Sequence, residues 1–497
     1  MGRFLKEGLS MRILVTGATG FVGHALVMRL LGAGHQVIAV SRSAGRARER
    51  LGAGPEVASL PDSASGFADL VSGCDAVVNL AGESVVSGRW TRKRKRALRT
   101  SRVTLTENLV AGMSRAKNPP RVLISASAIG IYGDRGSETV SEDSDLAGDF
   151  LANLCRDWEA AALAAREHGA RVTCLRIGIV LGRYGGAVDK LLPIFTAGLG
   201  GRLGSGKQFM SWIHLDDLVD LMLAALTDSR FSGPINAVSP SPVDNRQFSA
   251  ALAAAVGSKS RFPVPAVALK LRFGQAAQPL LASQRVVPSR LQDLQHHFRH
   301  PQLRSALDEL CAEDPTISVG SADEIGELPG SRYLESRRPR YRLAQRTVIP
   351  APIDQVFEFF SKAENLGAIT PPDMAFAIKT PTPISMKSDQ TIDYTIRLGP
   401  VPMRWRTVIE TWEPGRRFVD SQAKGPYRCW WHEHRFIPDG ESTIMEDQVL
   451  YKPPLGPLGW LANRLFIGRM LRRIFAYRSY VIAQRFGQSA ASMAKAA

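Results

Sequence analysis

The sequence predicts an α/β domain with a doubly wound parallel sheet, followed by a second domain of the α+β class. Its 497 residues are about three times the commonest domain length, so a single compact core is not expected. From Met11 onward, short apolar runs without polar alternation are each followed by a helix-length segment, the pattern of parallel strands buried on both faces. Beyond residue 340, polar and apolar residues alternate as in half-buried antiparallel strands.

Each expected element has its own sequence pattern. In the first domain the expected strands are RILVTG, HQVIAV, DAVVNLAG, RVLISAS and RVTCLRIGIV, with helices such as HALVMRLLGAG and NLCRDWEAAALAAREHG between them. In the second domain the expected strands are RLAQRTVIPAP, QTIDYTIRLG, RWRTVIETWEP and STIMEDQVLYKP. The expected helices of that domain are PIDQVFEFFSKAENL and a long segment over 458–486 with apolar residues at helical spacing.

Changes in composition and in hydrophobic pattern along the chain give the expected domain boundaries. Residues 312–340 are polar and rich in Gly, Pro and Ser, which is typical of a linker. The expected divisions are an N-terminal extension (1–10), a large α/β domain (11–240), a small substrate lobe (241–311), the linker (312–340), the α+β domain (341–487) and a flexible tail (488–497).

The composition is that of an ordinary globular protein, with 44% hydrophobic and 22% charged residues. Five cysteines occur without a CxxC pair, which favours a reducing cytoplasm over a disulfide scaffold. No stretch reaches the ~18 uncharged apolar residues of a spanning helix, and the N-terminus lacks a secretory signal.

The chain is strongly basic, with a formal net charge of +17 and a pI near 10.0. Such an excess suits nucleic acid, anionic lipid or phosphate-bearing ligands. One concentration, Arg89–Arg102, has no interleaved aromatic residue beyond Trp90, so we interpret it as a solvated helix face. No specific nucleic-acid binding is therefore expected.

The most informative motif is TGATGFVG at Thr16–Gly23, directly after the first strand and at the start of a helix. Glycines at this turn allow the backbone to approach a pyrophosphate, and the helix N-terminus presents oriented N–H groups. The strand-turn-helix context predicts a dinucleotide-binding Rossmann domain, with Gly17, Thr19, Gly20, Phe21, Val22 and Gly23 at the cofactor.

The end of the second strand indicates which dinucleotide is preferred. It reads Ser41-Arg42-Ser43, where an NAD-binding protein would usually place an Asp or Glu for the ribose. A guanidinium can bind a 2′-phosphate through two hydrogen bonds and charge. The sequence therefore predicts NADP(H) in preference to NAD(H), with Ser41 and Arg42 at the 2′ position; alternatively, Arg42 faces only solvent.

These motifs, together with ISASAIGIYG, LRIGIVLG and SWIHLDDL, resemble the extended short-chain dehydrogenase/reductases of the NAD-dependent epimerase/dehydratase type. GESVVSGRWT, GLGGRLGSGKQFMSWIH and SQRVVPSRL resemble an atypical epimerase-like subgroup whose members end in a short domain of unknown function (DUF1731). The resemblance covers about residues 11–310. It implies that Leu80, Ala81, Gly82, Ser125 and Val180 also line the cofactor.

The resemblance implies a catalytic Ser and a Tyr-x-x-x-Lys motif, and only the serine is found. Ser127 matches it, but alignment on Glu159 places Leu151 at the tyrosine position and Cys155 at the lysine position. The phenol of such a motif transfers a proton while hydride moves at the nicotinamide. The usual activity should therefore be weak unless another group substitutes.

Tyr132 and Lys190 are the residues that could replace the missing tyrosine and lysine. Together with Ser127 they are the predicted catalytic residues. Tyr132 follows Ser127 near the carboxyl edge of the sheet, although a packed loop aromatic is the simpler interpretation. Lys190 lies after a glycine-rich loop and could also be a solvated surface lysine. Cys155 is more simply a buried structural thiol.

Histidines and cysteines give no further catalytic or metal-binding prediction. His214 and Asp216 could form an acid-base pair, but the resemblance instead implies a turn that braces the substrate lobe. His296 is followed directly by His297, and His432 and His434 alternate with no cysteine nearby, so no metal site is predicted.

The segment YRLAQRTVIPAPIDQVFEFFSKAENLGAITPPDM resembles the opening of the START-like (SRPBCC) superfamily, which includes polyketide cyclases. The resemblance covers about residues 341–486 and implies a helix-grip fold around an apolar cavity. Six aromatic residues could form the walls of a cavity for a lipid, isoprenoid or aromatic ligand, or fill a solid core: Trp405, Trp412, Phe418, Tyr427, Trp430 and Trp431.

The last helix carries six arginines and no acid, with Arg478 interrupting its apolar face. A basic amphipathic helix can lie on anionic lipid, so peripheral membrane contact is one interpretation. The other is a helix that closes the cavity and points its arginines to solvent.

Three functional hypotheses follow. The first is an NADP(H)-dependent oxidoreductase acting on a small, apolar or ring-bearing substrate, with the second domain binding or presenting that molecule. The second is a catalytically silent NADP(H)-sensing regulator. The third is a lipid- or quinone-binding protein that uses the Rossmann domain as a scaffold.

Overall fold

The computed structural model describes residues 10–325, 329–398 and 401–487. The expected N-terminal extension, apart from Ser10, and the expected tail lie outside these ranges. The chain divides into two compact units, one formed by residues 1–30, 34–42 and 57–312, and the other by residues 31–33, 43–56 and 313–497.

The first unit is built on a seven-stranded sheet with the order β11-β7-β5-β4-β1-β2-β3. Every pairing from β2 to β11 is parallel. The strands are β1 (Arg12–Thr16), β2 (Gln36–Ser41), β3 (Glu56–Ser59), β4 (Ala76–Asn79), β5 (Val122–Ala128), β7 (Arg171–Ile177) and β11 (Gly233–Ala237). This order confirms the doubly wound prediction and places the switch point, where a ligand binds in such sheets, between β1 and β4.

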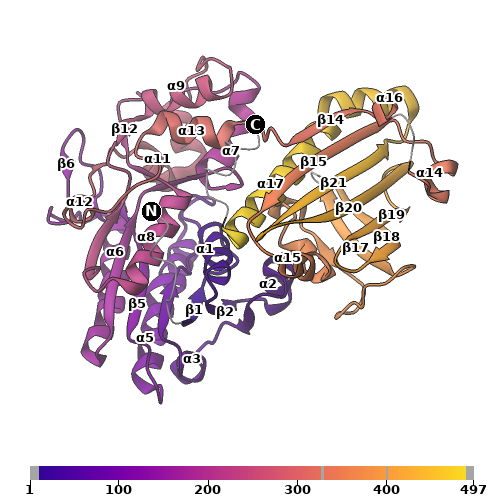
Figure 1. Cartoon of the computed structure of the whole chain (residues 1–497). Coiled ribbons are helices and arrows are strands. Elements are labelled where there is room, and N and C mark those ends of the chain that lie inside the picture. The colour runs from indigo at the N-terminus through magenta and orange to yellow at the C-terminus, as the bar shows by residue number, and fades with distance from the viewer. Residues whose placement is uncertain (1–9, 326–328, 399–400, 488–497) are drawn as a thin grey trace. The chain divides into compact units, whose positions relative to one another are not determined.

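Helices connect the strands of the sheet (Figure 1). They are α1 (Phe21–Gly32), α2 (Ala44–Leu51), α3 (Ala64–Val71), α4 (Arg92–Arg99), α5 (Leu105–Arg115), α6 (Phe150–Leu163) and α8 (Leu215–Thr227). One core cluster joins α3 and α5 to the sheet through the buried side chains of Leu14, Ile38, Phe67, Leu109 and Val172. Burial of both sheet faces explains why its strands lack polar alternation.

Short elements complete the first unit around the carboxyl ends of the strands. The strand pairs are β6 (Thr139–Val140) with β13 (Arg285–Val286), β8 (Ile179–Gly182) with β10 (Trp212–His214), and β9 (Phe209–Met210) with β12 (Val243–Asp244). The helices are α7 (Gly186–Thr196), α9 (Asn245–Ala255), α10 (Ala266–Phe273), α11 (Gln278–Leu281), α12 (Ser289–Asp293) and α13 (Leu303–Cys311). A separate core cluster packs α7, α9 and α13 together through Phe195, Phe248 and Leu307.

The second unit contains an eight-stranded sheet with the order β14-β15-β21-β20-β19-β18-β17-β16, and its strands lie side by side in Figure 1. Its pairings are antiparallel. The strands are β14 (Ile317–Ser321), β15 (Tyr341–Ile349), β16 (Ala377–Ile378), β17 (Thr391–Leu398), β18 (Val401–Glu413), β19 (Arg417–Lys424), β20 (Cys429–Asp439) and β21 (Ser442–Lys452). The helices are α14 (Arg332–Ser336), α15 (Ile353–Phe360), α16 (Gly456–Ala462) and the long α17 (Gly468–Phe486).

The interpretation of residues 312–340 as a linker is wrong for part of this segment. β14 pairs with β15 over Ile317–Ser321 and forms an edge of the eight-stranded sheet, and the short helix α14 buries Leu334. The strand was missed because an edge strand of five residues, rich in Ser and Gly, has little hydrophobic pattern of its own.

Candidate functional site

The glycine turn after β1 brings two backbone segments unusually close. Gly17 has a φ of +67°, and a Cβ there would lie 2.7 Å from the carbonyl carbon of Leu80, which follows β4. A Cβ on Gly23 would lie 2.2 Å from the carbonyl oxygen of Gly17, so α1 packs tightly on the turn. Gly20 is exposed, and the N-terminus of α1 follows it. This turn has the free space and the N–H groups that a dinucleotide diphosphate requires.

The other predicted cofactor residues surround the same sheet edge. Ala81 donates its backbone N–H to Thr16 Oγ1 at 3.2 Å, which ties the segment after β4 to the end of β1. A Cβ on Gly82 would lie 3.0 Å from the guanidinium carbon of Arg102. Thr19, Val22 and Val180 are half-buried. The structure thus brings these predicted residues together around the switch point.

Two residues of the predicted set have structural partners. The ring of Phe21 packs against the glycine-rich loop between β8 and α7, because a Cβ on Gly182, Gly185 or Gly186 would lie within 3.0 Å of that ring. Ser125 is 1% exposed, and its hydroxyl accepts a 3.5 Å hydrogen bond from Asn79. Ser125 therefore links β5 to the end of β4 through a buried hydrogen bond.

Arg42 lies at the carboxyl end of β2, beside the half-buried Ser41, and is highly exposed, with 79% of its side chain accessible. Its guanidinium donates to Glu83 at 2.6 Å, and Arg94 donates to the other oxygen of this carboxylate at 3.0 Å. Hydrogen bonds from Arg94 and Arg42 hold the pKa of Glu83 below its usual range. Glu83 and Arg94 were not predicted, and the only signal for them was their position just beyond the LAG segment.

The two predicted catalytic residues of the β5 region belong to a buried polar network. Ser127 is 3% exposed and donates to Glu159 at 2.6 Å, and Glu159 accepts two further bonds from Arg176 at 2.9 and 3.0 Å. Tyr132 is fully buried, donates to Asn236 at 2.7 Å and accepts from Arg176 at 2.8 Å. Burial raises the pKa of Tyr132 despite the nearby guanidinium. The enclosed and already paired hydroxyl fits the alternative of a packed loop aromatic, and a catalytic role of Tyr132 stays a prediction.

The remaining candidates differ in accessibility. Lys190 is exposed on α7. Cys155 is 5% exposed on α6, and burial raises its pKa to about 12, so the thiol is inert at neutral pH. His214 is 3% exposed and caps α8 by accepting the backbone N–H of Asp216 at 3.2 Å, as expected of a bracing turn. Burial lowers its pKa to about 3.

An apolar core cluster of the first unit packs against Leu80, one of the predicted cofactor residues. Trp90, Leu154 and Trp158 form a buried cluster, against which the half-buried side chains of Leu80 and Leu151 pack. Trp90 contacts the ring of Phe150, with 5.3 Å between the ring centroids.

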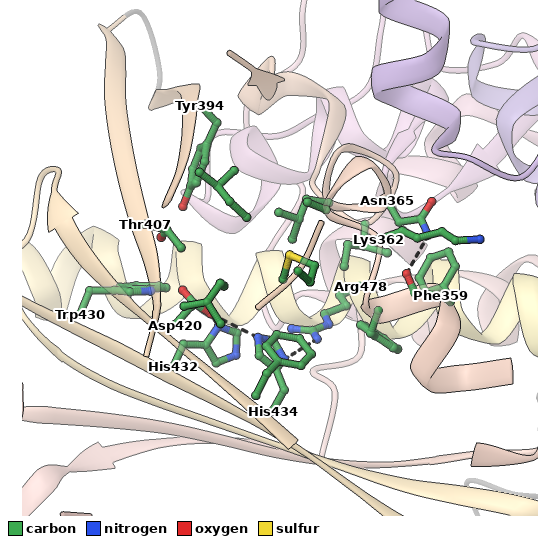
Figure 2. Close-up of a pocket in the computed structure, with 18 residues that line it drawn as sticks. Phe359, Lys362, Asn365, Tyr394, Thr407, Asp420, Trp430, His432, His434 and Arg478 are labelled. Carbon is green, nitrogen blue, oxygen red and sulfur yellow. Dashed lines mark hydrogen bonds and ion pairs between the residues drawn. The ribbon is translucent and has the colours of Figure 1, made fainter. Parts of the chain in front are cut away.

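The second unit has a partly open cavity of about 130 Å³, lined by residues of the sheet, of α15 and of α17 (Figure 2). Of the six predicted aromatic residues, Phe418 and Trp430 line it, and both expected roles of the aromatics are therefore found. Trp405 instead packs on Trp430 and Tyr427, at centroid distances of 5.2 and 5.7 Å, as core does. Most of the remaining lining is aliphatic or aromatic.

One side of the cavity is polar. Asp420, His432 and His434 line it, and Asp447 and Arg478 lie against the histidines. Burial lowers the pKa of His432 to about 4. Burial opposes the charge on Asp447, but Arg478 and hydrogen bonds from both histidines hold its pKa well below the usual range. The prediction of no metal site rested on the absence of cysteines near these histidines. In the fold, two adjacent strands place the carboxylates of Asp420 and Asp447 beside them.

The arginines of the last helix do not all face solvent. Arg478 is 6% exposed and forms a 3.3 Å ion pair with Asp447, which explains how a charge can interrupt the apolar face. Arg473 instead pairs with the exposed Asp373 at 2.7 Å. No helix among the described residues combines the length and apolar character needed to cross a membrane.

The doubly wound sheet and the glycine turn after β1 are those of a dinucleotide-binding Rossmann domain, and comparison with known proteins gives the family. The chain belongs to the NAD dependent epimerase/dehydratase family, whose model matches residues 13–237, and a domain of unknown function (DUF1731) matches residues 264–310. Within this family it is similar to the chloroplastic epimerase family protein SDR39U1 homolog of Arabidopsis thaliana, with 39% identity over 60% of this chain and 86% of the relative. The epimerase family protein MT2273 of Mycobacterium tuberculosis is 38% identical over 59% of this chain and 96% of the relative.

Solved structures give the same result for the first unit. Human epimerase family protein SDR39U1 (isoform 2) with NADPH has a TM-score of 0.55 and 35% identity, and the match covers 61% of this chain and 99% of that chain. A nucleoside-diphosphate sugar epimerase from Corynebacterium glutamicum has a TM-score of 0.50 and 35% identity, with 61% of this chain and 58% of that chain covered.

Proposed function

We propose that this chain is an NADP(H)-dependent oxidoreductase acting on an apolar or ring-bearing molecule. The observation that carries the proposal is the glycine turn at the switch point, where Gly17 and Gly23 leave no room for a Cβ and Gly20 is open to solvent. The bound nicotinamide would supply or accept hydride. The human SDR39U1 structure with NADPH, 35% identical to this chain, supports the same cofactor here.

The preference for NADP(H) over NAD(H) rests on Arg42. Its exposed guanidinium follows β2, where a dinucleotide presents its 2′ position, and no Asp or Glu of Ser41–Ser43 competes for the ribose. Glu83 forms an ion pair with Arg42 and orients its guanidinium. Arg94 forms an ion pair with the same carboxylate and adds a second positive charge beside it.

The side chains of this unit would shape the substrate site and transfer a proton, while the nicotinamide would transfer the hydride. The apolar wall around Trp90 and Leu151 excludes water and orients the substrate. Ser127, Glu159 and Arg176 stabilise the carboxyl end of β5 from within the core. Among the three predicted catalytic residues, Lys190 is the one with an exposed side chain, and we assign it the proton transfer.

An NADP(H)-sensing regulator is the second candidate function. The observation that favours it is the pair Leu151 and Cys155, which occupies the positions of the family's tyrosine and lysine and provides neither a phenol nor an ammonium. A panel of carbonyl and enone compounds, followed at the nicotinamide absorbance, distinguishes the two. Turnover of any compound that is lost in Lys190→Met supports the enzyme. Tight NADPH binding without any turnover supports the regulator.

For the second unit we propose a START-like, helix-grip domain that binds an apolar ligand such as a lipid or isoprenoid. The support is the apolar cavity between the antiparallel sheet and α17. Organic extraction of the purified full chain, followed by mass spectrometry, should recover such a ligand. Ile409→Trp, which fills the cavity from β18, should reduce its yield, and an equal yield from this variant would contradict cavity binding.

We propose a reducing, cytoplasmic setting, supported by five cysteines that include no CxxC pair. Peripheral contact with anionic lipid is a further candidate, favoured by exposed apolar residues in α16 and on either side of it. They are Leu455, Leu458, Trp460, Leu461 and Phe466. Cosedimentation of the chain with anionic vesicles, compared with Phe466→Ser, tests this contact.

A further inference from the structure

The cavity of the second unit has a polar side formed by three neighbouring strands. On β20, His432 and His434 are two residues apart and therefore point to the same face of the sheet. Asp420 of β19 lies directly across from His432, and Asp447 of β21 lies directly across from His434. Sheet register therefore brings together two imidazoles and two carboxylates that are up to 27 residues apart in the chain.

The distances among these groups fit metal ligation better than hydrogen bonding. Asp420 Oδ2 lies 3.5 Å from His432 Nδ1 and 3.4 Å from His434 Nε2, and the two ring centroids are 3.8 Å apart. Good hydrogen bonds to a carboxylate are shorter, near 2.8 Å. Ligand atoms ~2.0–2.1 Å from a tetrahedral zinc ion are separated from one another by about 3.3 Å. Both distances from Asp420 Oδ2 are close to this separation, and the ligand atoms of the three residues all lie within 4.8 Å of one another.

Asp447 contacts the other nitrogen of each ring. It lies 3.2 Å from His432 Nε2 and 2.8 Å from His434 Nδ1. If both rings direct their N–H toward Asp447, the nitrogens nearest Asp420 carry free lone pairs. A carboxylate that orients metal-ligating histidines in this way is common in metalloproteins.

Arg478 permits a second arrangement of the histidine hydrogens. Its guanidinium is 3.0 Å from His434 Nδ1, which can accept from it when the ring carries its hydrogen on Nε2. The ring would then offer Asp420 only a long 3.4 Å contact. His434 Nδ1 also lies 2.8 Å from Asp447, and the lone pair on Nε2 is free when Nδ1 donates to that carboxylate. Metal binding requires this donation to Asp447.

Within the part of the chain that the structure describes, Asp420 also lacks a guanidinium or ammonium partner of its own. Among the described residues, no lysine or arginine lies within ion-pairing distance of Asp420, although only 16% of its side chain is accessible. A carboxylate removed from water without a cation is costly, so a bound cation would stabilise it.

We propose that Asp420, His432 and His434 bind a divalent first-row transition metal, with zinc as the ion of preference. Two imidazoles and one carboxylate form the donor set of several catalytic zinc sites, which keep a further position open. Because all three residues line the cavity, the open position would face its interior and accept water or an oxygen atom of the cavity's occupant. Figure 2 shows the three side chains together, with Arg478 of α17 beside His434. This inference is independent of the nicotinamide site.

A second group of possible metal ligands lies in the first unit, but one of its histidines has no free lone pair. His214, His300 and Glu309 could be brought to one ion by distance alone. However, His214 Nδ1 accepts the backbone N–H of Asp216, so its hydrogen resides on Nε2 and neither nitrogen offers a free lone pair. His300→Gln is therefore a suitable control for binding elsewhere in the chain.

The test is zinc binding by the untagged full chain after treatment with a chelator. Isothermal titration with zinc chloride should give one tight site, whereas magnesium, which prefers oxygen ligands, should give none. Asp420→Asn and His434→Asn should weaken zinc binding by more than about 100-fold, and Asp447→Asn by about 10- to 100-fold. Glu433→Gln changes an acid between the two histidines on the opposite face of β20 and should leave zinc affinity unchanged.

Wild-type measurements make the proposal testable even if a variant fails to fold. Cobalt(II) should give the visible absorption of a tetrahedral site, and X-ray absorption at the zinc edge should show two imidazole nitrogens with oxygen and no sulfur. The proposal is overturned if the wild type binds no zinc, if a thiolate appears among the ligands, or if a folded Asp420→Asn retains full affinity. Loss of binding in His300→Gln with retention in His434→Asn would likewise overturn it.

Discussion

Ser127 donates a 2.6 Å hydrogen bond to Glu159, the carboxylate that also pairs with Arg176 in the core of the first unit. In the family this serine is expected to orient a substrate carbonyl. Here its hydroxyl is committed to a buried ion pair. We therefore expect Ser127→Ala to lower the free energy of unfolding by about 1.5–3 kcal/mol, the contribution of a hydrogen bond to a charged group. The affinity for NADPH, measured by titration, should not change, and a large loss of that affinity would mean that Ser127 contacts the cofactor.

The ion pair itself should contribute more to stability. Glu159→Gln leaves the guanidinium of Arg176 buried without a full counter-charge, because the two side chains are 6% and 4% accessible. The expected loss is about 3–5 kcal/mol in urea denaturation. Asp157→Asn on the same helix removes an exposed partner of Arg99 and should cost less than about 1 kcal/mol. Equal losses in the two variants would contradict this account of the network.

A larger side chain in the glycine turn at Gly17–Gly23 tests whether this turn binds the dinucleotide. Gly20→Val should abolish NADPH binding, because its side chain would project from an exposed turn into the space assigned to the diphosphate. Gly330→Val, where no described atom lies within 4 Å of the added Cβ, should bind NADPH as the wild type does. Fluorescence titration with NADPH measures both. Unchanged affinity in Gly20→Val would remove the assignment.

Arg42 should determine the choice between the two dinucleotides. Arg42→Glu removes a charge-assisted bond worth about 1.5–3 kcal/mol, so NADPH should bind about 10- to 100-fold more weakly while NADH changes little. Arg230→Glu, another exposed arginine paired with an acid, serves as the control. The ratio of the two dissociation constants is the readout. The same ratio in Arg42→Glu as in the wild type would mean that Arg42 does not contact the 2′ group.

Cys155 should remain unreactive toward alkylating reagents in the native protein. Burial raises its pKa to about 12, so at pH 8 almost none of the thiol is ionised, and thiolate forms only as the pH approaches that value. Because the pKa is raised on folding, the associated stability is present below the unfolded pKa and is lost as pH rises above it. Iodoacetamide labelling read by mass spectrometry should modify Cys155 only after denaturation. Rapid native labelling at pH 8 would show an activated thiol.

The sequence predicts the parallel sheet well because its strands are buried on both faces. The runs that contain β1, β4 and β5 are short and continuously apolar, and glycines are required at the turn where Gly17 adopts a positive φ. The antiparallel strands from β15 to β21 are likewise visible in their alternation. β14 was missed because its pairing with β15 depends on a partner that lies across the intervening chain.

The polar sites were harder to predict, since they depend on which strands become neighbours. Asp420 and His432 are separated by 12 positions in sequence, and nothing in their spacing gives the register that places them opposite each other. Arg478 looked like a solvent-facing residue because helical spacing alone cannot reveal an acid on the adjoining sheet. Tyr132 and Ser127 had the right place in the sequence for catalysis, but their hydroxyls are satisfied by buried partners.

Isothermal titration of the full chain with NADPH and with NADH tests the central assignment most directly. The structure predicts one site that binds NADPH with measurable heat, and binds NADH about 10-fold or more weakly because only the phosphorylated dinucleotide can engage Arg42. Absence of heat with both dinucleotides would contradict a diphosphate cradle at Gly17–Gly23.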